Sequence, residues 1–328
     1  MISGGARRAL LPLVCLVALL PAAAVRSATV TVIQGDSGPI FEQIRISFTA
    51  AFQQLEDVTG SLAARQVTVV RLDRVEAAHA PYALRQEMRS SRPDLIVVIG
   101  SEAWQAVMDF LPAADTPPIL FCLVGKQGLD TRMQAPERVS GIRLLPAPAE
   151  VLDFYRSWFP GRRLSVIYDP ASFGYIVDEF KQAQISSGIR LDCHAIGSVH
   201  EIPRVFSEVL PAAEGLLVFP SWDVYPTYIV RAIFREAAGR GIPAFSPRVT
   251  DIDNGALFTI TPDWQSLGPQ LADLAARGLA QHQLRNLPPV SPGKLVYTVN
   301  RRIYSLLGYK IPADGAALAV WRDADLMK

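Results

Sequence analysis

Short apolar segments alternate with longer segments of helical period along most of this chain, and the alternation occurs twice. A parallel strand covered by helices on both faces reads as a continuous apolar run, and an amphipathic helix follows it. The first series of apolar runs is 29–33, 67–71, 94–99 and 118–124, and the second is 164–168, 191–196, 215–219 and 242–245. The pattern predicts two successive α/β units of about a hundred residues each, an ordinary size for a domain.

The segments between these runs carry apolar residues at helical spacing. In the segment 40–58, for example, Ile44, Phe48 and Phe52 fall on one stripe. The helices expected in this way are 40–58, 82–90 and 102–111 in the first unit, and 148–158, 176–187, 199–210 and 225–239 in the second. Strands and helices together predict an α/β protein with a doubly wound parallel sheet in each unit.

Three short extended segments join the two units in place of one long linker, and we expect them to act as a hinge. The helical segment 264–282 has no strand partner in the second unit, so the chain is expected to return to the first unit there. The predicted organisation is a first lobe of residues 29–140 and 262–290, a second lobe of residues 144–254 and 294–328, and hinge crossings near 141–143, 255–261 and 291–294.

The first residues have the pattern of an export leader. Two arginines at 7–8 precede an apolar run over 9–20, and Ala22 and Ala24 supply small residues at the spacing that signal peptidase accepts. The run is shorter than the roughly twenty apolar residues that a membrane span needs. We therefore expect residues 1–24 to be a cleaved signal peptide and the mature protein to be periplasmic. An uncleaved membrane anchor is the alternative.

Charge and cysteine content argue against several classes of function. Lys plus Arg number 32 and Asp plus Glu number 31, without a basic block, so no nucleic-acid partner is expected. Cys122 and Cys193 each lie in an apolar run, which favours buried small side chains over a disulfide. The four histidines are scattered, so we expect no metal site, and no sequence motif indicates a cofactor.

Ligands of open parallel sheets bind outside the carboxyl ends of the strands. If two such sheets face each other across a hinge, the loops after their strands line one binding site. The candidate ligand-binding residues in the first lobe are Asp36, Gly100, Ser101, Glu102 and Lys126. Those in the second lobe are Asp169, Phe173, Ser221, Trp222, Asp223 and Arg248.

Some of these residues suit an anionic group of a ligand. Gly100 and Ser101 open a helix whose backbone N–H groups favour a carboxylate. Lys126 and Arg248 are cations in strand-end loops of the first and the second lobe. A purely structural interpretation stays open, with Ser101 as a helix cap and the two cations as solvated loop charges.

Other candidates suit a cationic group. Trp222 beside Asp223 offers an aromatic face and a carboxylate to an amine. Trp222 is equally compatible with packing between lobes, and Asp223 with capping the helix that follows. Both kinds of group together suit an amino acid.

Several segments carry a resemblance to a known family. They are 93–100, 117–121, 139–142, 166–172, 241–245 with 254–257, and 299–300 with 307–312. In this order and spacing they resemble the bacterial ABC-transporter substrate-binding proteins with a type I periplasmic-binding fold, whose better-known members take tryptophan or other amino acids. The resemblance covers nearly all of the mature chain. It departs from the family's pattern at Ser101-Glu102, at the tryptophan within 220–224, and over 247–251, so the scaffold transfers better than the ligand.

The resemblance implies a monomer that closes on a small-molecule ligand and delivers it to the membrane permease of an ABC transporter, without a reaction. A periplasmic sensor that reports to a membrane kinase or receptor is an alternative on the same fold. An enzyme is a further alternative. The sequence has no GxSxG, HExxH or P-loop motif, although Asp169 and Asp223 are compatible with acid/base chemistry. The identity of the ligand does not follow from the sequence.

Overall fold

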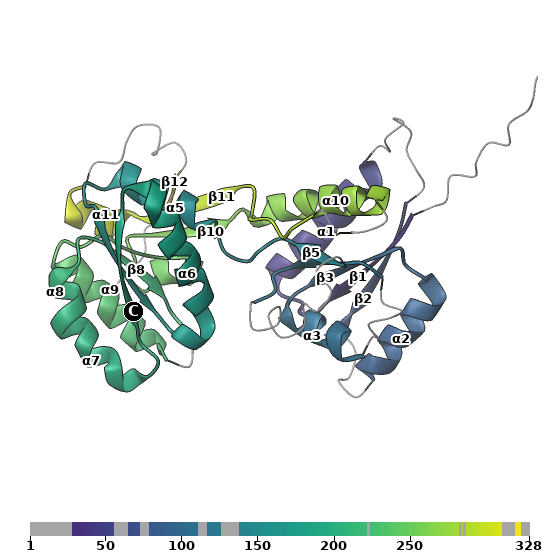
Figure 1. Cartoon of the computed structure of the whole chain (residues 1–328), viewed down its shortest axis with the longest axis horizontal. Coiled ribbons are helices and arrows are strands. Elements are labelled where there is room, and N and C mark those ends of the chain that lie inside the picture. Colours follow the sequence, from purple (N-terminus) through teal and green to yellow (C-terminus); the bar gives the residue numbers. More distant parts are fainter. Residues whose placement is uncertain are drawn as a thin grey trace, which may run out of the picture.

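The structure is a computed structural model, and Figure 1 shows its two α/β lobes. The expected leader, residues 1–24, lies outside the described part of the chain. The described residues are 28–55, 65–72, 79–110, 117–125, 138–221, 224–281, 284, 287–309 and 319–322. Among them, no helix combines the length and the apolar character needed to cross a bilayer.

The first lobe is built on a parallel sheet of strand order β2-β1-β3-β4-β5. Its strands are β1 (Ala28–Gln34), β2 (Arg65–Arg71), β3 (Leu95–Ile99), β4 (Ile119–Cys122) and β5 (Val139–Gly141). Helices α1 (Pro39–Gln54) and α10 (Trp264–Gln281) cover one face, and α2 (Ala80–Ser91) and α3 (Ser101–Phe110) cover the other. This is the doubly wound arrangement that the alternating pattern predicts.

Strand β3 shows why a continuous apolar run predicts a strand with helices on both faces. All five of its residues are buried. Leu95, Val97 and Ile99 pack in the cluster with α1 and α10. Ile96 and Val98 pack in the cluster with α2 and α3. A strand with helices on both faces needs apolar side chains at every position, since successive side chains point to opposite faces.

The second lobe has a seven-stranded sheet of order β12-β11-β10-β9-β8-β6-β7. Its strands are β6 (Arg163–Tyr168), β7 (Arg190–Ala195), β8 (Leu216–Phe219), β9 (Ala244–Ser246), β10 (Phe258–Pro262), β11 (Leu295–Asn300) and β12 (Ala319–Arg322). Its helices are α5 (Pro148–Trp158), α6 (Pro170–Ser187), α7 (Ile202–Arg204), α8 (Leu210–Ala212), α9 (Thr227–Gly239) and α11 (Arg301–Leu307). A π-helical segment, Val205–Val209, joins α7 to α8, and short 3₁₀ turns cover Val199–Glu201 and Val249–Ile252.

The predicted fold class is confirmed, with one difference in the second sheet. Strands β6 to β10 are parallel, but β11 pairs antiparallel with β10, and β12 runs parallel to β11. The reversal arises because the chain returns from the first lobe and enters the sheet directly beside the strand by which it left.

Helix α10 belongs to the first lobe, where it packs along α1. Leu267, Leu271 and Leu274 are buried in the same cluster as the α1 stripe. Gly268 lets the two helices approach closely, because a Cβ atom added there would lie only 2.5 Å from the Phe48 backbone nitrogen. The chain therefore leaves the second lobe, crosses the first and comes back.

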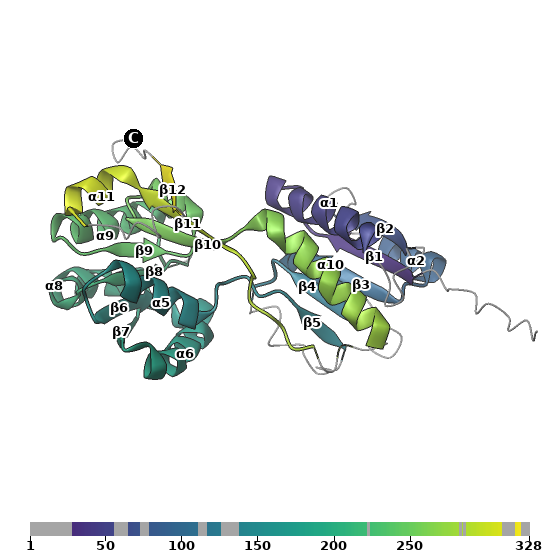
Figure 2. The same ribbon diagram turned by 90° about the horizontal axis from the view of Figure 1, so that it is seen from above.

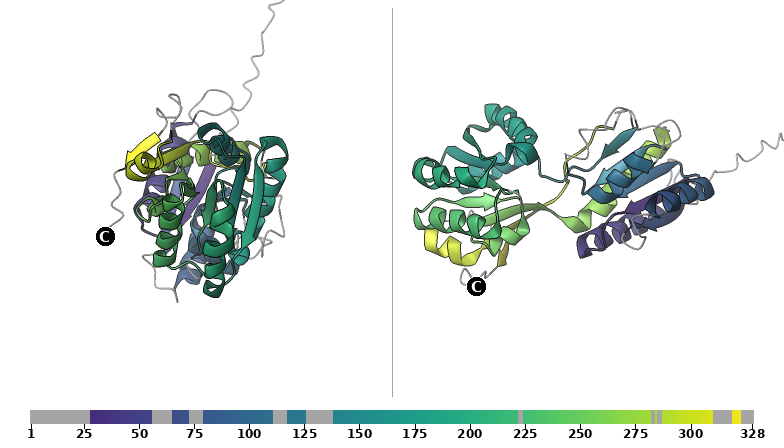
Figure 3. Two further views of the ribbon diagram at one scale, coloured as in Figure 1. Left: turned by 90° about the vertical axis from the view of Figure 1, so that its left-hand side faces the viewer. Right: turned by 90° about the horizontal axis from the view of Figure 1, so that it is seen from below.

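The connections between the lobes gather in one narrow region, which Figures 2 and 3 show from above and below. The first connection runs from β5 to α5, the second from β10 to α10, and the third from α10 to β11. The second lies at Asp263, later than the expected 255–261. The reason is that Phe258–Pro262 is a buried, hydrogen-bonded strand of the second sheet.

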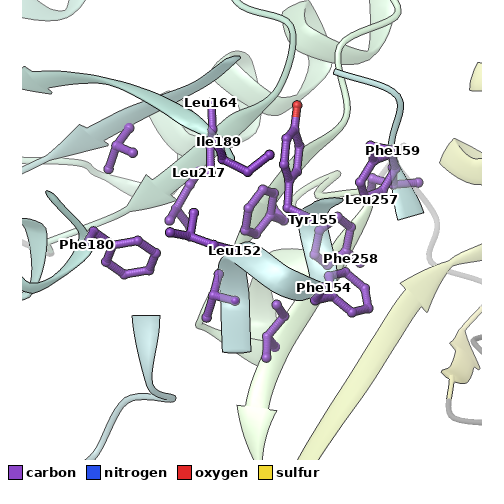
Figure 4. Packing of buried hydrophobic residues seen from close by; sticks show 14 of the residues in the cluster. Leu152, Phe154, Tyr155, Phe159, Leu164, Phe180, Ile189, Leu217, Leu257 and Phe258 are labelled. Atoms are coloured by element: carbon purple, nitrogen blue, oxygen red, sulfur yellow. The ribbon is translucent and has the colours of Figure 1, made fainter. Parts of the chain in front are cut away.

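Helix α5 and strands β10 and β11, to which the three connections lead, meet in one hydrophobic cluster; Figure 4 shows part of it, with Phe154 and Phe258 labelled. Phe154 lies in the second half of α5, and its ring centroid is 4.7 Å from that of Phe258 on β10. The Phe154 ring also stacks on Tyr297 of β11, at 4.4 Å. Phe258 also stacks on Phe245 of β9, at 4.4 Å. Aromatic pairs at such distances add to the burial of their surface, so these three segments are held as one body.

Candidate functional site

The carboxyl edges of the two sheets are the edges next to the opposite lobe. The carboxyl end of β5 continues directly into the connection to the second lobe, and the other four strands of the first sheet are parallel to it. The carboxyl end of β10 continues in the same way toward α10 of the first lobe, and β6, β8 and β9 run parallel to β10. Ligands of such sheets bind where the strand order reverses at this edge.

In the first lobe the order reverses between β1 and β3, and a glycine follows each strand. Gly35 N donates to Ile99 O at 3.0 Å, and Gly100 N donates to Cys122 O at 2.9 Å. Gly100 has a φ of +101°, and a Cβ atom on it would lie 2.7 Å from the Phe41 ring. A Cβ atom on Gly35 would lie 2.8 Å from the Ala103 nitrogen. Main chain at the start of α3 and the Phe41 ring therefore line this point.

The predicted first-lobe residues stand around these glycines. Ser101 is the first residue of α3, and its Oγ accepts a hydrogen bond at 3.0 Å from Gly125 N, in the loop after β4. Glu102 is exposed in the first turn of α3. Asp36 is also exposed, and its Oδ1 accepts from Gly38 N at 2.8 Å. Lys126 lies outside the described residues. The lobe thus presents two exposed carboxylates beside a helix N-terminus.

A polar cluster that the sequence did not reveal lies next to this point. Gln34, the last residue of β1, is fully buried, and its Nε2 donates to Asp36 O at 2.6 Å and to Glu42 Oε1 at 3.3 Å. Glu42 also pairs with Arg45 at 2.6 Å and with Arg71, at the end of β2, at 2.5 Å. The hydrogen bond from Arg45 is the main cause that lowers the pKa of Glu42 below its ordinary 4.5, while burial opposes it.

One side-chain atom and one backbone conformation at this edge are also unusual. The Oε1 atom of Gln34 is buried and has no hydrogen-bond partner among the described residues. Leu123, directly after β4, has a φ of +57°. Such a backbone conformation is costly for a residue with a side chain and is concentrated at functional sites. Neither feature has a local sequence pattern by which it could have been found.

In the second lobe the order reverses between β6 and β8. Asp169 follows β6, is buried, and caps α6: its Oδ1 accepts from Ala171 N at 3.0 Å, and its Oδ2 accepts from Ser172 Oγ at 2.7 Å. Phe173 stacks on Phe219, the last residue of β8, at 5.4 Å. The structure brings Asp169, Phe173 and the loop after β8 to one point.

That loop contains three of the predicted residues. Ser221 is buried, and its Oγ accepts from Val224 N at 3.4 Å. Trp222 and Asp223 lie outside the described residues. The structure therefore gives the position of the loop's two ends beside Asp169 and Phe219.

Arg248 lies one strand further along, in the loop after β9. Its Nε and Nη2 donate to Asp251 Oδ1 at 3.1 and 2.7 Å. Asp251 is fully buried and also accepts from Ser246 Oγ at 2.6 Å and from Asn254 Nδ2 at 3.0 Å. The Arg248 charge is thus balanced within its own loop, a structural role that the sequence did not reveal. The expected contact with an anionic ligand would have to share the guanidinium with Asp251.

An apolar pocket lies at the same edge of the second sheet, beside the first connection. It is small and partly open to solvent. The residues at its rim belong to the connection, the ends of β8 and β9, and helix α6: Leu145, Pro146, Phe219, Ser246, Pro247 and Ile176. The lining also includes Val151, Phe180 and Leu217 of the second-lobe core, so the pocket lies between helices α5 and α6 and the sheet.

Two classes of reactive site, metal centres and exposed thiols, are not seen in the described part of the chain. The described part of the chain holds no group of three or more His, Cys, Asp or Glu side chains that could bind a metal ion. Cys122 and Cys193 are both unpaired; Cys122 is buried and Cys193 half-buried. Burial raises the pKa of the Cys122 thiol to about 12, so this thiol stays protonated and unreactive at neutral pH.

Several solved structures have a similar fold. No protein-family model and no curated protein matches the sequence. The ligand-free, open structure of a substrate-binding protein with adhesive properties from Clostridium difficile matches with a TM-score of 0.69 and 17% identity, over 91% of this chain and 100% of that one.

Two further structures match over most of their length. An ABC domain in complex with L-Trp from Streptococcus pneumonia has a TM-score of 0.54 and 16% identity, over 90% of this chain and 99% of the other. An ABC transporter substrate-binding protein from Sphaerobacter thermophilus has a TM-score of 0.53 and 16% identity, over 78% and 81%. The chain therefore has the type I periplasmic-binding fold of ABC-transporter substrate-binding proteins, as the sequence resemblance implies.

Proposed function

We propose that this protein is the extracytoplasmic solute-binding component of an ABC uptake transporter. It captures a small polar ligand between its lobes by hinge closure and presents it to a membrane permease, without a reaction at the ligand. One observation carries the proposal. The strand order reverses between β1 and β3 in the first sheet and between β6 and β8 in the second, and the carboxyl ends of these strands lie next to the opposite lobe. One small molecule can then contact both lobes, and its binding favours the closed arrangement.

The connections support a hinge and not a flexible tether. Val290 N donates to Gly141 O at 2.9 Å and Arg143 N donates to Val290 O at 2.8 Å, which ties the third connection to the first. Asp263 N donates to Lys294 O at 2.9 Å, which ties the second to the third. Segments joined in this way bend together, and a few residues at the ends of elements absorb the change in dihedral angles.

The site chemistry supports an amino-acid ligand. The N-terminus of α3 suits a carboxylate. The exposed Asp36 and Glu102, and the predicted Asp223, suit an ammonium group. The Phe41 ring beside Gly100 offers surface to an apolar side chain. The complex of the Streptococcus pneumonia domain with L-Trp has the same fold, so L-Trp is the first ligand to test.

Thermal shift measurements with each of the twenty amino acids, L-Trp first, test the proposal. A ligand at about 100 times its dissociation constant adds roughly 2.7 kcal/mol to the free energy of unfolding. Native mass spectrometry of protein purified from a periplasmic extract extends the test to ligands that are bound during purification. A protein that carries no small molecule and responds to no amino acid would count against an amino-acid ligand, and turnover of a bound compound would favour an enzyme.

Site variants locate the ligand. We expect Trp222→Ala or Asp223→Ala to abolish most of the ligand-induced shift in melting temperature while the ligand-free melting temperature stays nearly unchanged. Gln53→Ala is the control, since Gln53 is exposed near the C-terminal end of α1, away from the carboxyl edge. Equal ligand shifts in the site variants and the control would remove Trp222 and Asp223 from the site.

A further inference from the structure

The backbone of Arg143 is attached to the first lobe. Arg143 N donates to Val290 O at 2.8 Å, and the residues after Val290 are held by the α10 side chain of Gln270. Gln270 Nε2 donates to Ser291 O at 2.9 Å, and Gly293 N donates to Gln270 Oε1 at 2.9 Å. These bonds form a continuous path from Arg143 to α10, which packs on α1. The backbone at Arg143 therefore moves with the first lobe.

The side chain of Arg143 is attached to the second lobe. Its Nη1 lies 3.0 Å from Oε2 of Glu179, in the middle of α6. Helix α6 packs on the second sheet through Ile176, Val177 and Phe180, on either side of Glu179. Arg143 therefore spans the hinge, with its main chain on one body and its guanidinium on the other.

We propose that the Arg143–Glu179 ion pair is a latch that holds the hinge in the arrangement seen here and lowers the population of the closed form without ligand. This inference rests on the hinge closure of the proposed function. Closure rotates α6 relative to the Arg143 backbone about the intervening connection, and an ion pair at 3.0 Å is lost when its atoms separate by a few ångströms. The latch therefore opposes closure until ligand contacts outweigh it.

The expected effect is modest, because the two side chains are 46% and 39% exposed. Exposed ion pairs of this kind change an equilibrium by about two- to fivefold. Salt weakens them, since the Debye length is about 10 Å at 0.1 M ionic strength and shorter above it. Removal of the latch should raise the closed population of the ligand-free protein by the same factor, and high salt should remove the difference.

Spin-label distances in the ligand-free, mature protein measure this population. Gln105→Cys on α3 and Tyr228→Cys on α9 place labels at exposed positions on helices that begin at the facing edges, with Cys193→Ala to avoid a third label. The short-distance fraction should rise about two- to fivefold in Glu179→Gln and in Arg143→Gln at 50 mM NaCl. It should be equal in all variants at 1 M NaCl.

Asp178→Asn is the matched control. Asp178 pairs with Lys181 at 2.8 Å on the same helix. This variant therefore removes an ion pair of α6 that does not join the two lobes. The exchange Arg143→Glu with Glu179→Arg should restore the wild-type distribution. If Glu179→Gln gives the same distances as wild type and Asp178→Asn, there is no latch. The ligand-dependent test of closure is separate, so loss of the latch would leave the proposed function standing.

Discussion

At the scale of single residues, Asp169 caps helix α6 and is also predicted to contact the ligand. Two substitutions can separate these roles. Asn caps helices as well as Asp does, whereas Ala does not. We expect Asp169→Ala to lower the free energy of unfolding by about 1 kcal/mol in urea denaturation, because α6 loses the acceptor for Ala171 N. Asp169→Asn should keep the stability. If the carboxylate charge also contacts the ligand, Asp169→Asn should lose ligand affinity at unchanged stability, and equal affinity would make Asp169 a cap alone.

Glu42 makes stability depend on pH in the acid range. Its pKa in the folded protein is lowered below 4.5, chiefly by the hydrogen bond from Arg45. A lowered pKa means that the folded state binds protons less readily than the unfolded state. The contribution is therefore fully present above about pH 4.5 and is lost as the pH falls through the folded-state pKa. Wild type should lose more stability than Glu42→Gln between pH 6 and pH 3 in denaturant titrations, and parallel curves would contradict this.

The sequence could predict residues whose role is local, and it missed those whose partners are distant. The turn at Gly100 was recognisable because strand-to-helix turns have their own residue preferences, whereas the bond from Gly125 N to Ser101 Oγ joins residues distant in the sequence. The Gln34–Glu42–Arg71 cluster was not recognisable, because its members come from two strands and a helix. The Arg248–Asp251 pair was missed for another reason: a cation in an edge loop looks the same whether it faces a ligand or a buried carboxylate.

At the scale of elements, the end of β5 depends on Gly141. Its φ is +156°, and a Cβ atom there would overlap the Phe121 main chain, which is only 2.7 Å away at the nitrogen. We expect Gly141→Ala to cost about 3 kcal/mol of unfolding free energy, because β5 must move away from β4. Gly174→Ala is a control in open space within α6. Equal midpoints for the two variants in urea would show that β5 tolerates a side chain here.

Strands buried on both faces were the elements that the sequence predicted best, since no other element of that length is apolar at every position. The segment 255–261 shows the limit. From the sequence, an extended apolar run is compatible both with a connection and with the start of a central strand. Phe258–Pro262 is identified as β10 by its pairing with β9 and β11 in the structure. Strand β12 was missed because Ala319–Arg322 is short and, among the described strands, pairs with β11 alone.

At the scale of the whole molecule, a return of the chain to its first lobe produces both the hinge and the site. Helix α10 fills the face of the first sheet beside α1, and β11 and β12 complete the second sheet. The first lobe is therefore finished only when the chain returns to it in α10, and the second only after the third crossing. The crossings hold the two carboxyl edges next to each other, and one ligand can then bridge the two points of strand-order reversal.

Small-angle X-ray scattering tests this central claim most directly. The mature protein is measured alone and with a saturating concentration of the compound that raises its melting temperature most. Closure of the lobes on the ligand predicts a smaller radius of gyration and a shorter maximum dimension with that compound. Scattering profiles that superimpose with and without it, although the melting temperature rises, would show that the ligand binds without bringing the lobes together.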